Sequence, residues 1–539
     1  TLSGLAFRRK RAGVEFSLNL DRGKEAEFQI VIAVGEETKS DAGGRPRRPA
    51  PGRSNLEIRQ GLDQSAAKWI ADFARVKSDS ILLTQLMDRS LKDLRMLLSN
   101  RDGFGYFSAG TPWFATVFGR DSLLTSIEAL PYHGETAADV LRLLSAHQSR
   151  RTNEWTDEQP GKILHELRRG ELARVGAIPH SPYYGGIDTT LLYLILMARY
   201  LRWTGDRALF DQLRPNMEAA LRWSLTDADS NGDGYIDYTT GSDGGLANKG
   251  WKDSGDAVVD KKGRFPPGPI ALIEVQAYAY AAWSEIADIF EAEGETARAR
   301  ELRQRAAGMR QRLNKDYWVD SEGTFAFYID GKGRRGDTVV SNAGHALWAG
   351  AAEPEKARLT AKRLMADDMF SGWGIRTLAE GEAAYNPVGY HLGSVWPHDN
   401  MMIAAGLRRY GLDAEALKVC EAMFQAGLYF DYHRLPELFC GFGRDRHSIP
   451  VHYPVACHPQ AWAAGAVPYG LSICLGLEPD AARNRLRIVR PQLPSFARNV
   501  EIAGLRVGRG RVHFSVTRRD DGRCETRVID DGGVTVEVG

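Results

Sequence analysis

Apolar residues recur at helical spacing from about residue 62 to residue 478, which is the pattern of amphipathic helices that pack on one another. A first helix is predicted near 62–76. Twelve further helices are predicted at 79–99, 120–132, 135–150, 186–203, 206–225, 270–292, 295–316, 338–350, 354–367, 391–410, 412–430 and 458–477. Strand-like alternation is confined to the two ends of the chain.

The connections between these helices alternate in length. The short ones are 133–134, 204–205, 293–294, 351–353 and 411, and the long ones are 151–185, 226–269, 317–337, 368–390 and 431–457. This alternation predicts a mainly α fold, an (α/α)6 toroid barrel in which the long loops emerge at one end. Binding and catalytic residues usually lie on such loops, so we expect the active site there.

Four segments follow from this pattern. Residues 14–20 and 27–34 read as strands, and two or three strands cannot bury a core alone. We therefore expect residues 1–35 to be the tail of an N-terminal β-domain whose start is missing or lies elsewhere. A Gly-, Pro- and Arg-rich linker is expected at 36–60, the barrel at 61–478 and a small C-terminal β-element at 479–539.

The composition narrows the class of partner. A net charge of +1 gives no electrostatic reason to expect nucleic acid or a membrane surface, and no apolar run has the length of a spanning helix. The five cysteines form no C-x-x-C pair and are odd in number, which favours free thiols in a reducing, cytoplasmic location. The oligomeric state stays open.

The long loop 226–269 carries the main catalytic candidate. Residues 250–256 hold a Trp, a Lys and two Asp between two Gly. Asp253 is predicted to be a general acid, because desolvation beside Trp251 would raise its pKa, although an inward Lys252 would lower it. Asp256 is the rival acid, and we favour Asp253 because its Trp-x-Asp context is drier.

The last long loop supplies the partner. Glu437 lies there between Pro436 and Phe439, 184 residues from Asp253 (437 − 253), so only a closed fold could bring the two together. One protonated and one ionised carboxylate in an aromatic-lined pocket suit the hydrolysis of a glycosidic bond. Glu437 is predicted to be the base that activates water. Sequence spacing cannot choose between inversion and retention.

Other polar and aromatic residues of the long loops suit a polyhydroxylated ligand, since pyranose faces stack on rings and hydroxyls need hydrogen-bonding partners. The structural alternatives are helix caps at Asp121 and Asp188 and a structural network around His165 and Glu166. A zinc site at His165 and Glu166 is not favoured, because the second His at helical spacing is missing. The candidate substrate-binding residues are Trp113, Arg120, Asp121, His165, Glu166, Trp251, Lys252, His391, Trp396 and His398.

One motif resembles a calcium loop. Asp229, Asn231, Asp233 and Asp237 stand in a D-x-N-x-D-G-x-I pattern, but Thr240 occupies position twelve, where a bidentate Glu is usual. The sequence therefore leaves two readings open, a structural calcium ion and a tight Asx-rich turn. No cofactor is expected to be required.

Three motifs carry a family resemblance. Trp-Phe-Ala-Thr-Val-Phe-Gly-Arg-Asp-Ser at 113–122, Gly-Trp-Lys-Asp-Ser at 250–254 and Pro-Glu-Leu-Phe at 436–439 resemble the amylo-α-1,6-glucosidase part of glycogen debranching enzymes. More closely, they are similar to bacterial glycogen-debranching-like proteins that have a separate N-terminal β-domain. More distantly, the layout is similar to processing α-glucosidases and mannosylglycerate hydrolase.

The resemblance implies an inverting (α/α)6 hydrolase with its acid Asp after the fifth helix and its base Glu before the twelfth, where the helix count places Asp253 and Glu437. It also implies that Arg120 and Asp121 hold the terminal sugar. The chain lacks the transferase domain of the eukaryotic debranching enzymes, so glucan transfer is not expected.

The leading hypothesis is an inverting glycosidase that releases the non-reducing-end sugar from an oligosaccharide or α-glucoside. The alternatives are a hydrolase of an α-mannoside or α-rhamnoside and a non-catalytic carbohydrate-binding toroid. The polar loops argue against a terpenoid cyclase. A phosphorylase would need phosphate in place of the base.

Overall fold

The computed structural model describes residues 7–10, 13–24, 55–239 and 244–539. The chain divides into two units, Thr1–Ala71 and Asp72–Gly539. In the first unit, β1 (Phe7–Lys10) and β2 (Gly13–Phe16) form an antiparallel pair, and α1 spans Asn55–Ala71. The predicted strand 27–34 and most of the predicted linker lie outside the described residues.

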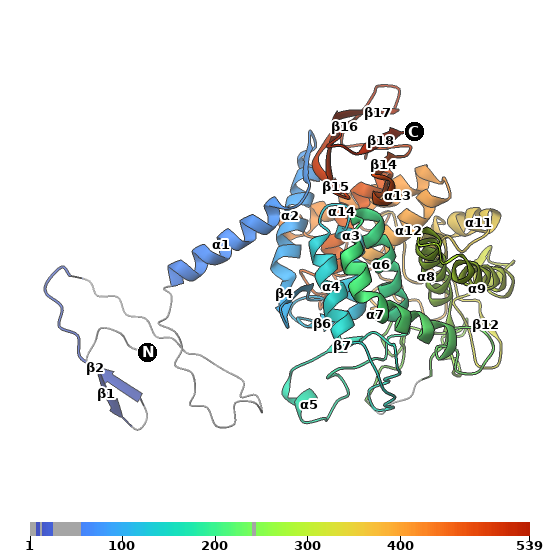
Figure 1. The fold of residues 1–539 in the computed structure, drawn as a ribbon, viewed down its shortest axis with the longest axis horizontal. Helices are drawn as coiled ribbons and strands as arrows, with labels where there is room; N and C mark the ends of the chain where they lie inside the picture. Colours follow the sequence, from blue (N-terminus) through green and yellow to red (C-terminus); the bar gives the residue numbers. More distant parts are fainter. Residues whose placement is uncertain (1–6, 11–12, 25–54, 240–243) are drawn as a thin grey trace. The chain divides into compact units, whose positions relative to one another are not determined.

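Six inner helices form a closed ring in the second unit (Figure 1). Each packs on the next, and the last returns to pack on the first. Because both faces of these helices are covered, they are buried nearly all round, as α6 and α14 show. The inner helices are α3 (Gly119–Ala129), α6 (Thr189–Thr204), α8 (Ile273–Ala292), α10 (Ala343–Ala349), α12 (Pro397–Arg409) and α14 (Ala461–Leu475).

Six outer helices surround the ring and bury only one face each. They are α2 (Ile81–Leu97), α4 (Glu135–Ala146), α7 (Arg207–Thr226), α9 (Thr296–Asp316), α11 (Pro354–Leu364) and α13 (Asp413–Ala426). The sequence predicted these twelve helices, with errors mainly at the starts of inner helices. α12, for example, begins six residues later than the predicted 391, at Pro397, because proline fits only the first turn of a helix.

The prediction of a helix at 62–76 was wrong at both of its ends. The helix begins earlier, as α1, and residues 75–78 form β3 (Arg75–Ser78). β3 pairs with β15 (Asn499–Val507), which continues to β16 (Gly510–Arg518) and β17 (Cys524–Asp530) in one antiparallel sheet of order β17-β16-β15-β3. The sheet of the C-terminal segment therefore includes β3, a strand from the start of the second unit.

A second C-terminal sheet has the order β13-β14-β18. Its strands are β13 (Leu477–Asp480), β14 (Arg485–Ile488) and β18 (Thr535–Val538). Short strands and one short helix stiffen the long loops. They are β4 (Leu98–Arg101), β5 (Phe104–Phe107), β6 (Val117–Phe118), β7 (Glu166–Leu167), α5 (Glu171–Arg174), β8 (Ala271–Leu272), β9 (Trp318–Val319), β10 (Thr324–Phe325), β11 (Tyr328–Ile329) and β12 (Arg335–Gly336).

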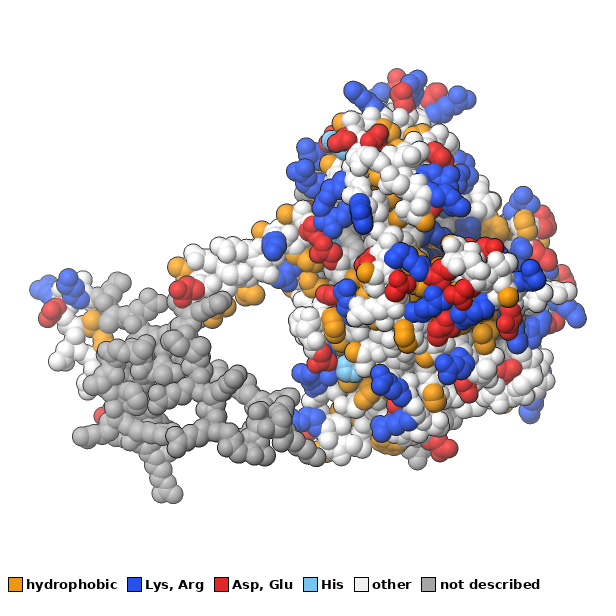
Figure 2. Space-filling view, viewed as in Figure 1, with side chains coloured by type: hydrophobic (Ala, Val, Ile, Leu, Met, Phe, Trp, Pro, Cys, Tyr) orange, Lys and Arg blue, Asp and Glu red, His pale blue; other side chains and the backbone are white. Residues whose placement is uncertain are grey.

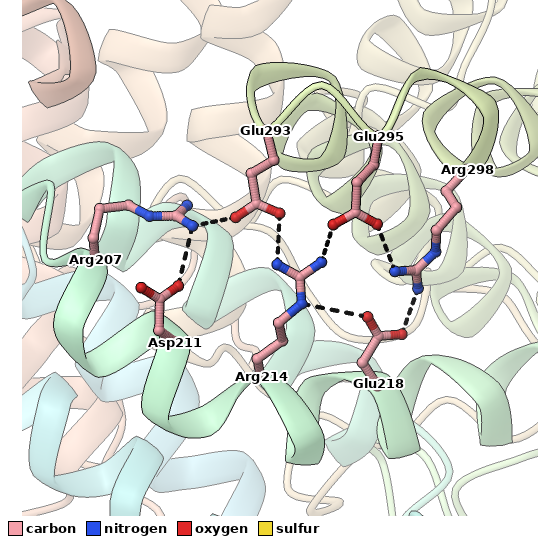
Figure 3. Close-up of polar contacts among 7 residues, drawn as sticks. All are labelled: Arg207, Asp211, Arg214, Glu218, Glu293, Glu295 and Arg298. Carbon is pink, nitrogen blue, oxygen red and sulfur yellow. Dashed lines mark hydrogen bonds and ion pairs between the residues drawn. The ribbon is translucent and has the colours of Figure 1, made fainter.

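A network of ion pairs joins α7 to α9 and to the short turn before α9 (Figure 3). Arg214 lies at its centre and contacts Glu293 at 2.8 Å and also Glu295 and Glu218. The turn belongs to the end of the barrel away from the long loops. The network therefore fastens two outer helices without touching the candidate site. Across the face shown in Figure 2, cations and carboxylates are interspersed.

The ring closes where α14 meets α3. Gly465 of α14 faces Glu128 of α3, and a Cβ at Gly465 would lie 2.2 Å from Oε2 and 3.1 Å from Cβ of Glu128. Only a glycine allows the two helices to approach this closely. Among the helices of the described ranges, none has the length and apolar character needed to cross a membrane.

Candidate active site

The inner helices all begin at the end of the barrel where the long loops emerge, and each brings a polar side chain there. Helix N-termini stabilise negative charge, which explains why most of these side chains are carboxylates. They are Asp121 in α3, Asp188 before α6, Glu274 in α8, Asn342 before α10, Asp399 in α12 and Gln460 before α14.

Asp253 opens into this end of the barrel. Its side chain is 28% exposed, and its Oδ2 accepts a hydrogen bond from Nη1 of Arg120 at 3.1 Å. Nε of the buried Arg120 also donates to Asp188 at 2.7 Å, so Arg120 bridges two carboxylates. Burial raises the pKa of Asp253, and the Arg120 guanidinium opposes that rise. Asp256, the rival acid, is exposed and accepts a hydrogen bond from Ser254.

Glu437 is buried and held at both oxygens. Oε1 accepts a hydrogen bond from the hydroxyl of Tyr390 at 2.5 Å, and Oε2 accepts one from the backbone N–H of Cys457 at 2.8 Å. Burial raises the pKa of Glu437, both hydrogen bonds lower it, and the charge of Asp253 raises it further. The structure thus brings the two predicted carboxyl groups within electrostatic reach of each other, from loops far apart in sequence.

Asp121 completes the acidic cluster. Its Oδ1 accepts a hydrogen bond from Nε2 of Gln460 at 3.2 Å. Burial raises its pKa to about 7, and the charges of Asp253 and Glu437 contribute to the rise. Asp188 lies at the start of α6 but its side chain makes no cap hydrogen bond there, since it accepts from Arg120 instead.

Aromatic rings cluster around Trp251, two residues before Asp253. The buried Trp251 has His391, Trp396 and His398 edge-on at centroid distances of 5.1–5.7 Å. His398 stacks on Trp462 at 3.8 Å. Trp113 differs from them, because it is 56% exposed and its Nε1 donates to the carbonyl of Val455 at 2.9 Å. Four of the predicted sugar contacts therefore form a buried layer and one lies at the surface.

Three other predicted contacts have partners in the protein. Lys252 is 1% exposed, and its Nζ donates to the carbonyl of Thr377 at 2.6 Å. Glu166 pairs with Arg168 and lies 2.7 Å from His180, and the buried His165 packs against Phe118 and Tyr183. These residues therefore have contacts within the protein, and a sugar contact for each of them stays a prediction. For His165 and Glu166 this is the network that was the alternative reading.

The 229–237 loop gathers the predicted carboxylates. One oxygen each of Asp229, Asp233 and Asp237 lies within 4.8 Å of the others. The same groups also accept backbone N–H bonds, as in an Asx-rich turn, and Asn231 donates to Asp233 at 3.0 Å. Burial raises the pKa of Asp237 to about 6. Thr240 lies outside the described residues, and calcium binding stays a prediction.

Sequence reasoning missed Tyr390, Gln460 and the amide of Cys457 as partners of the carboxyl groups. Tyr390 is adjacent to the predicted His391, and Gln460 lies one residue before the last inner helix. Position at the start of an inner helix was the signal that could have found Gln460. A backbone amide carries no signal in the sequence.

A family model for the mannosylglycerate hydrolase MGH1-like glycoside hydrolase domain matches residues 117–429. No curated protein matches the chain. Among solved structures, the chain is similar to a GH78 family rhamnosidase of Bacillus sp. GL1, with a TM-score of 0.61, 15% identity and coverage of 87% of this chain and 43% of that one. The chain is also similar to a structure named sialidase, with a TM-score of 0.62, 11% identity and coverage of 87% of this chain and 41% of that one.

A third similar structure is the GH63 mannosylglycerate hydrolase from Thermus thermophilus in complex with Tris, with a TM-score of 0.55, 14% identity and coverage of 71% of this chain and 99% of that one. The chain spans less than half the length of the first two structures. At these identities the likeness shows the fold, a mainly helical (α/α)6 glycoside hydrolase domain with small β-sheets. Together, the comparisons support a glycoside hydrolase domain rather than an α-glucosidase in particular.

Proposed function

Because this chain belongs to the MGH1-like glycoside hydrolase family, we propose that it hydrolyses an α-glycoside with inversion, with Asp253 as general acid and Glu437 as general base. One observation carries the proposal. Two carboxyl groups from loops 184 residues apart (437 − 253) meet at the N-terminal ends of the inner helices, one partly open and one buried.

The sugar we propose first is an α-mannoside, released from the non-reducing end. Support comes from the family description and from the mannosylglycerate hydrolase among the similar structures. An α-rhamnoside is second, because a rhamnosidase has the same fold. The debranching-like motifs keep α-glucosides in the test panel.

The hydrogen bonds of Asp253 suggest how it would act. Oδ2 is taken by Arg120, so Oδ1 is the oxygen that would carry the proton. As the bond between the anomeric carbon and the leaving oxygen breaks, that proton passes to the leaving oxygen. Burial raises the pKa of Asp253, which is the direction that a general acid requires.

Glu437 would act from the opposite face of the sugar. Its two accepted hydrogen bonds favour the ionised carboxylate despite its burial. A water attacks the anomeric carbon as its proton passes to Glu437, and the product has the opposite anomeric configuration. The buried aromatic layer would keep other water away from the reacting carbon.

Anomer-resolved proton NMR tests the proposal. Methyl α-mannoside, methyl α-rhamnoside, methyl α-glucoside and mannosylglycerate are each followed during the first minutes of reaction. The expected result is early β-anomer from one of the α-linked substrates. Early α-anomer would refute inversion, and sugar binding without any release would favour the non-catalytic toroid.

A further inference from the structure

We propose that Lys252 positions the acid Asp253 relative to the base Glu437. It does so by fixing the acid loop, residues 250–256, to a segment that is hydrogen-bonded to the loop of Glu437. The inference rests on the proposed function, because it assigns Lys252 a role in that same reaction. It replaces the sugar contact that the sequence suggested for this residue.

The anchor of Lys252 lies in the long loop 368–390 and is held by further hydrogen bonds. Nζ donates to the carbonyl of Thr377 at 2.6 Å, and Thr377 is fully buried. The N–H of Thr377 donates to the carbonyl of Ser394 at 2.8 Å, and its hydroxyl oxygen accepts from the N–H of Gly393 at 2.9 Å. The N–H and the hydroxyl of Thr377 therefore fix the residue whose carbonyl accepts the hydrogen bond from Lys252.

The same segment is joined to the base loop. Val395 and Phe439 exchange two backbone hydrogen bonds of 2.9 and 3.0 Å, and Phe439 lies two residues after Glu437. A continuous path of short hydrogen bonds thus leads from Lys252 through Thr377 and Ser394 to the loop of Glu437. It joins the loops of the two proposed catalytic carboxyl groups.

The surroundings of Nζ explain why a lysine is needed there. A buried ammonium is costly unless charges and hydrogen bonds compensate it. Asp399 and Glu274, in the first turns of α12 and α8, attract the Lys252 charge. Nζ also lies 5.1 Å from the ring centroid of Trp251 and 5.4 Å from that of Phe327, within the range of cation–π contacts.

Trp251 is also buried, and its ring packs on other rings. Its ring is parallel to His345 at 5.9 Å, and His345 in turn lies 2.7 Å from Asp399 and 2.5 Å from the hydroxyl of Tyr278. Both residues before Asp253 are therefore buried and fixed, while Asp253 itself is open. This arrangement leaves the acid little freedom to move away from a leaving group.

A displaced acid has a distinctive kinetic signature. A poor leaving group such as methanol needs the proton from Asp253, whereas 2,4-dinitrophenolate leaves without it. Misplacing a catalytic group by about 1 Å can cost on the order of 10²-fold in rate. Loss of Lys252 should therefore slow the methyl glycoside more than the 2,4-dinitrophenyl glycoside of the same sugar. A general loss of folded enzyme would slow both equally.

The test compares Lys252→Met with Lys162→Met, using both glycosides of the sugar that the wild type releases. Lys162 is a matched control because it is also buried and donates to a backbone carbonyl, that of Asp157 at 3.0 Å. The carboxylate of Asp157 pairs with Lys249 at 2.8 Å, so the control lies near the loop of Asp253 but does not donate to Thr377. We expect Lys252→Met to lose about 10-fold or more kcat/KM on the methyl glycoside beyond its loss on the dinitrophenyl glycoside. Lys162→Met should lose equally on both.

Equal losses on both glycosides in Lys252→Met would overturn the inference. If that variant does not fold, Lys252→Gln, which keeps a donor without the charge, takes its place with the same expected direction. Asp253→Asn separates this inference from the proposed function. Selective loss in Asp253→Asn without selective loss in the Lys252 variant refutes only the positioning role, and no selective loss in Asp253→Asn refutes the acid assignment.

Discussion

Removing the hydroxyl of Tyr390 should shift the pH dependence of catalysis. In Tyr390→Phe, Oε1 of Glu437 loses the hydrogen bond that it accepts at 2.5 Å, while the Cys457 N–H bond to Oε2 remains. The lost bond favours the ionised form, so its removal raises the pKa of Glu437. The aromatic ring stays, which limits the disturbance to one oxygen atom.

The size of the shift follows from the energy of the bond. A hydrogen bond to a charged group contributes about 1.5–3 kcal/mol, and one pKa unit corresponds to about 1.4 kcal/mol. The pKa of Glu437 should therefore rise by about 1–2 units. Because a general base must be ionised, activity is lost as the pH falls through this pKa, and the acidic limb of kcat/KM should move to higher pH by the same amount.

The assay is the pH profile of kcat/KM on one fixed substrate. Tyr453→Phe is the matched control, since its ring lies 5.7 Å from that of Tyr390 and the described structure shows no hydrogen bond from its hydroxyl to Glu437. The control should keep the wild-type acidic limb. An unchanged limb in Tyr390→Phe, with activity retained, would refute the assignment of that limb to Glu437.

Four further predictions concern the carboxyl pair, the 229–237 loop and the ion-pair network. Asp253→Asn should remove nearly all turnover on unactivated glycosides while sugar affinity, measured by calorimetry, stays largely intact; full turnover would exclude it as the acid. Glu437→Gln should be rescued in part by azide, and full activity without azide would exclude a base role. If the 229–237 loop binds calcium, the ion should raise Tm at pH 7.5 and do so less at pH 5, because Asp237 protonates near pH 6. In the metal-free protein the pH dependence of stability runs the other way, because the pKa of Asp237 is raised in the folded state. The contribution of Asp237 to the free energy of unfolding is present below its ordinary pKa of 3.8 and is lost as the pH rises through about 6. No difference in Tm between calcium and EDTA at pH 7.5 would count against the site. Arg214→Met should lower the free energy of unfolding by about 1 kcal/mol, because its partners are only partly exposed, and by less in about 1 M salt; an equal loss at both salt concentrations would contradict an ionic origin.

Helical periodicity and loop length were enough to predict the twelve helices of the barrel, because each helix reports its own buried face locally. They did not locate the starts of the inner helices. Thr377 and Lys252 show why the site was harder to predict. The sequence does not show whether a lysine next to a carboxylate on a loop points into the protein or into solvent, and the acceptor of Lys252 is a backbone carbonyl 125 residues away.

Pairing between distant segments was the other limit. A helix cap, an interaction within a few residues, was one of two alternatives for Asp188, yet its side chain accepts from Arg120, 68 residues earlier. Likewise, β3 has too few residues to signal a strand and exists because β15 supplies its hydrogen bonds. Such features depend on the closed ring and follow from no local pattern.

The close approach of Gly465 to Glu128 bears on the stereochemistry of the reaction. A ring of six helices has no free edge, so a wider spacing at one contact must be shared around the circumference. An alanine at Gly465 would place a Cβ 2.2 Å from Oε2 and 3.1 Å from Cβ of Glu128, so either that side chain must turn aside or α14 and α3 must separate slightly. If the helices separate, the loop of Glu437 would shift with the start of α14. The gap between the two carboxyl groups, which decides whether a water fits between sugar and base, would change with it. The methyl group of Gly465→Ala would then act as a spacer between two helices of the ring.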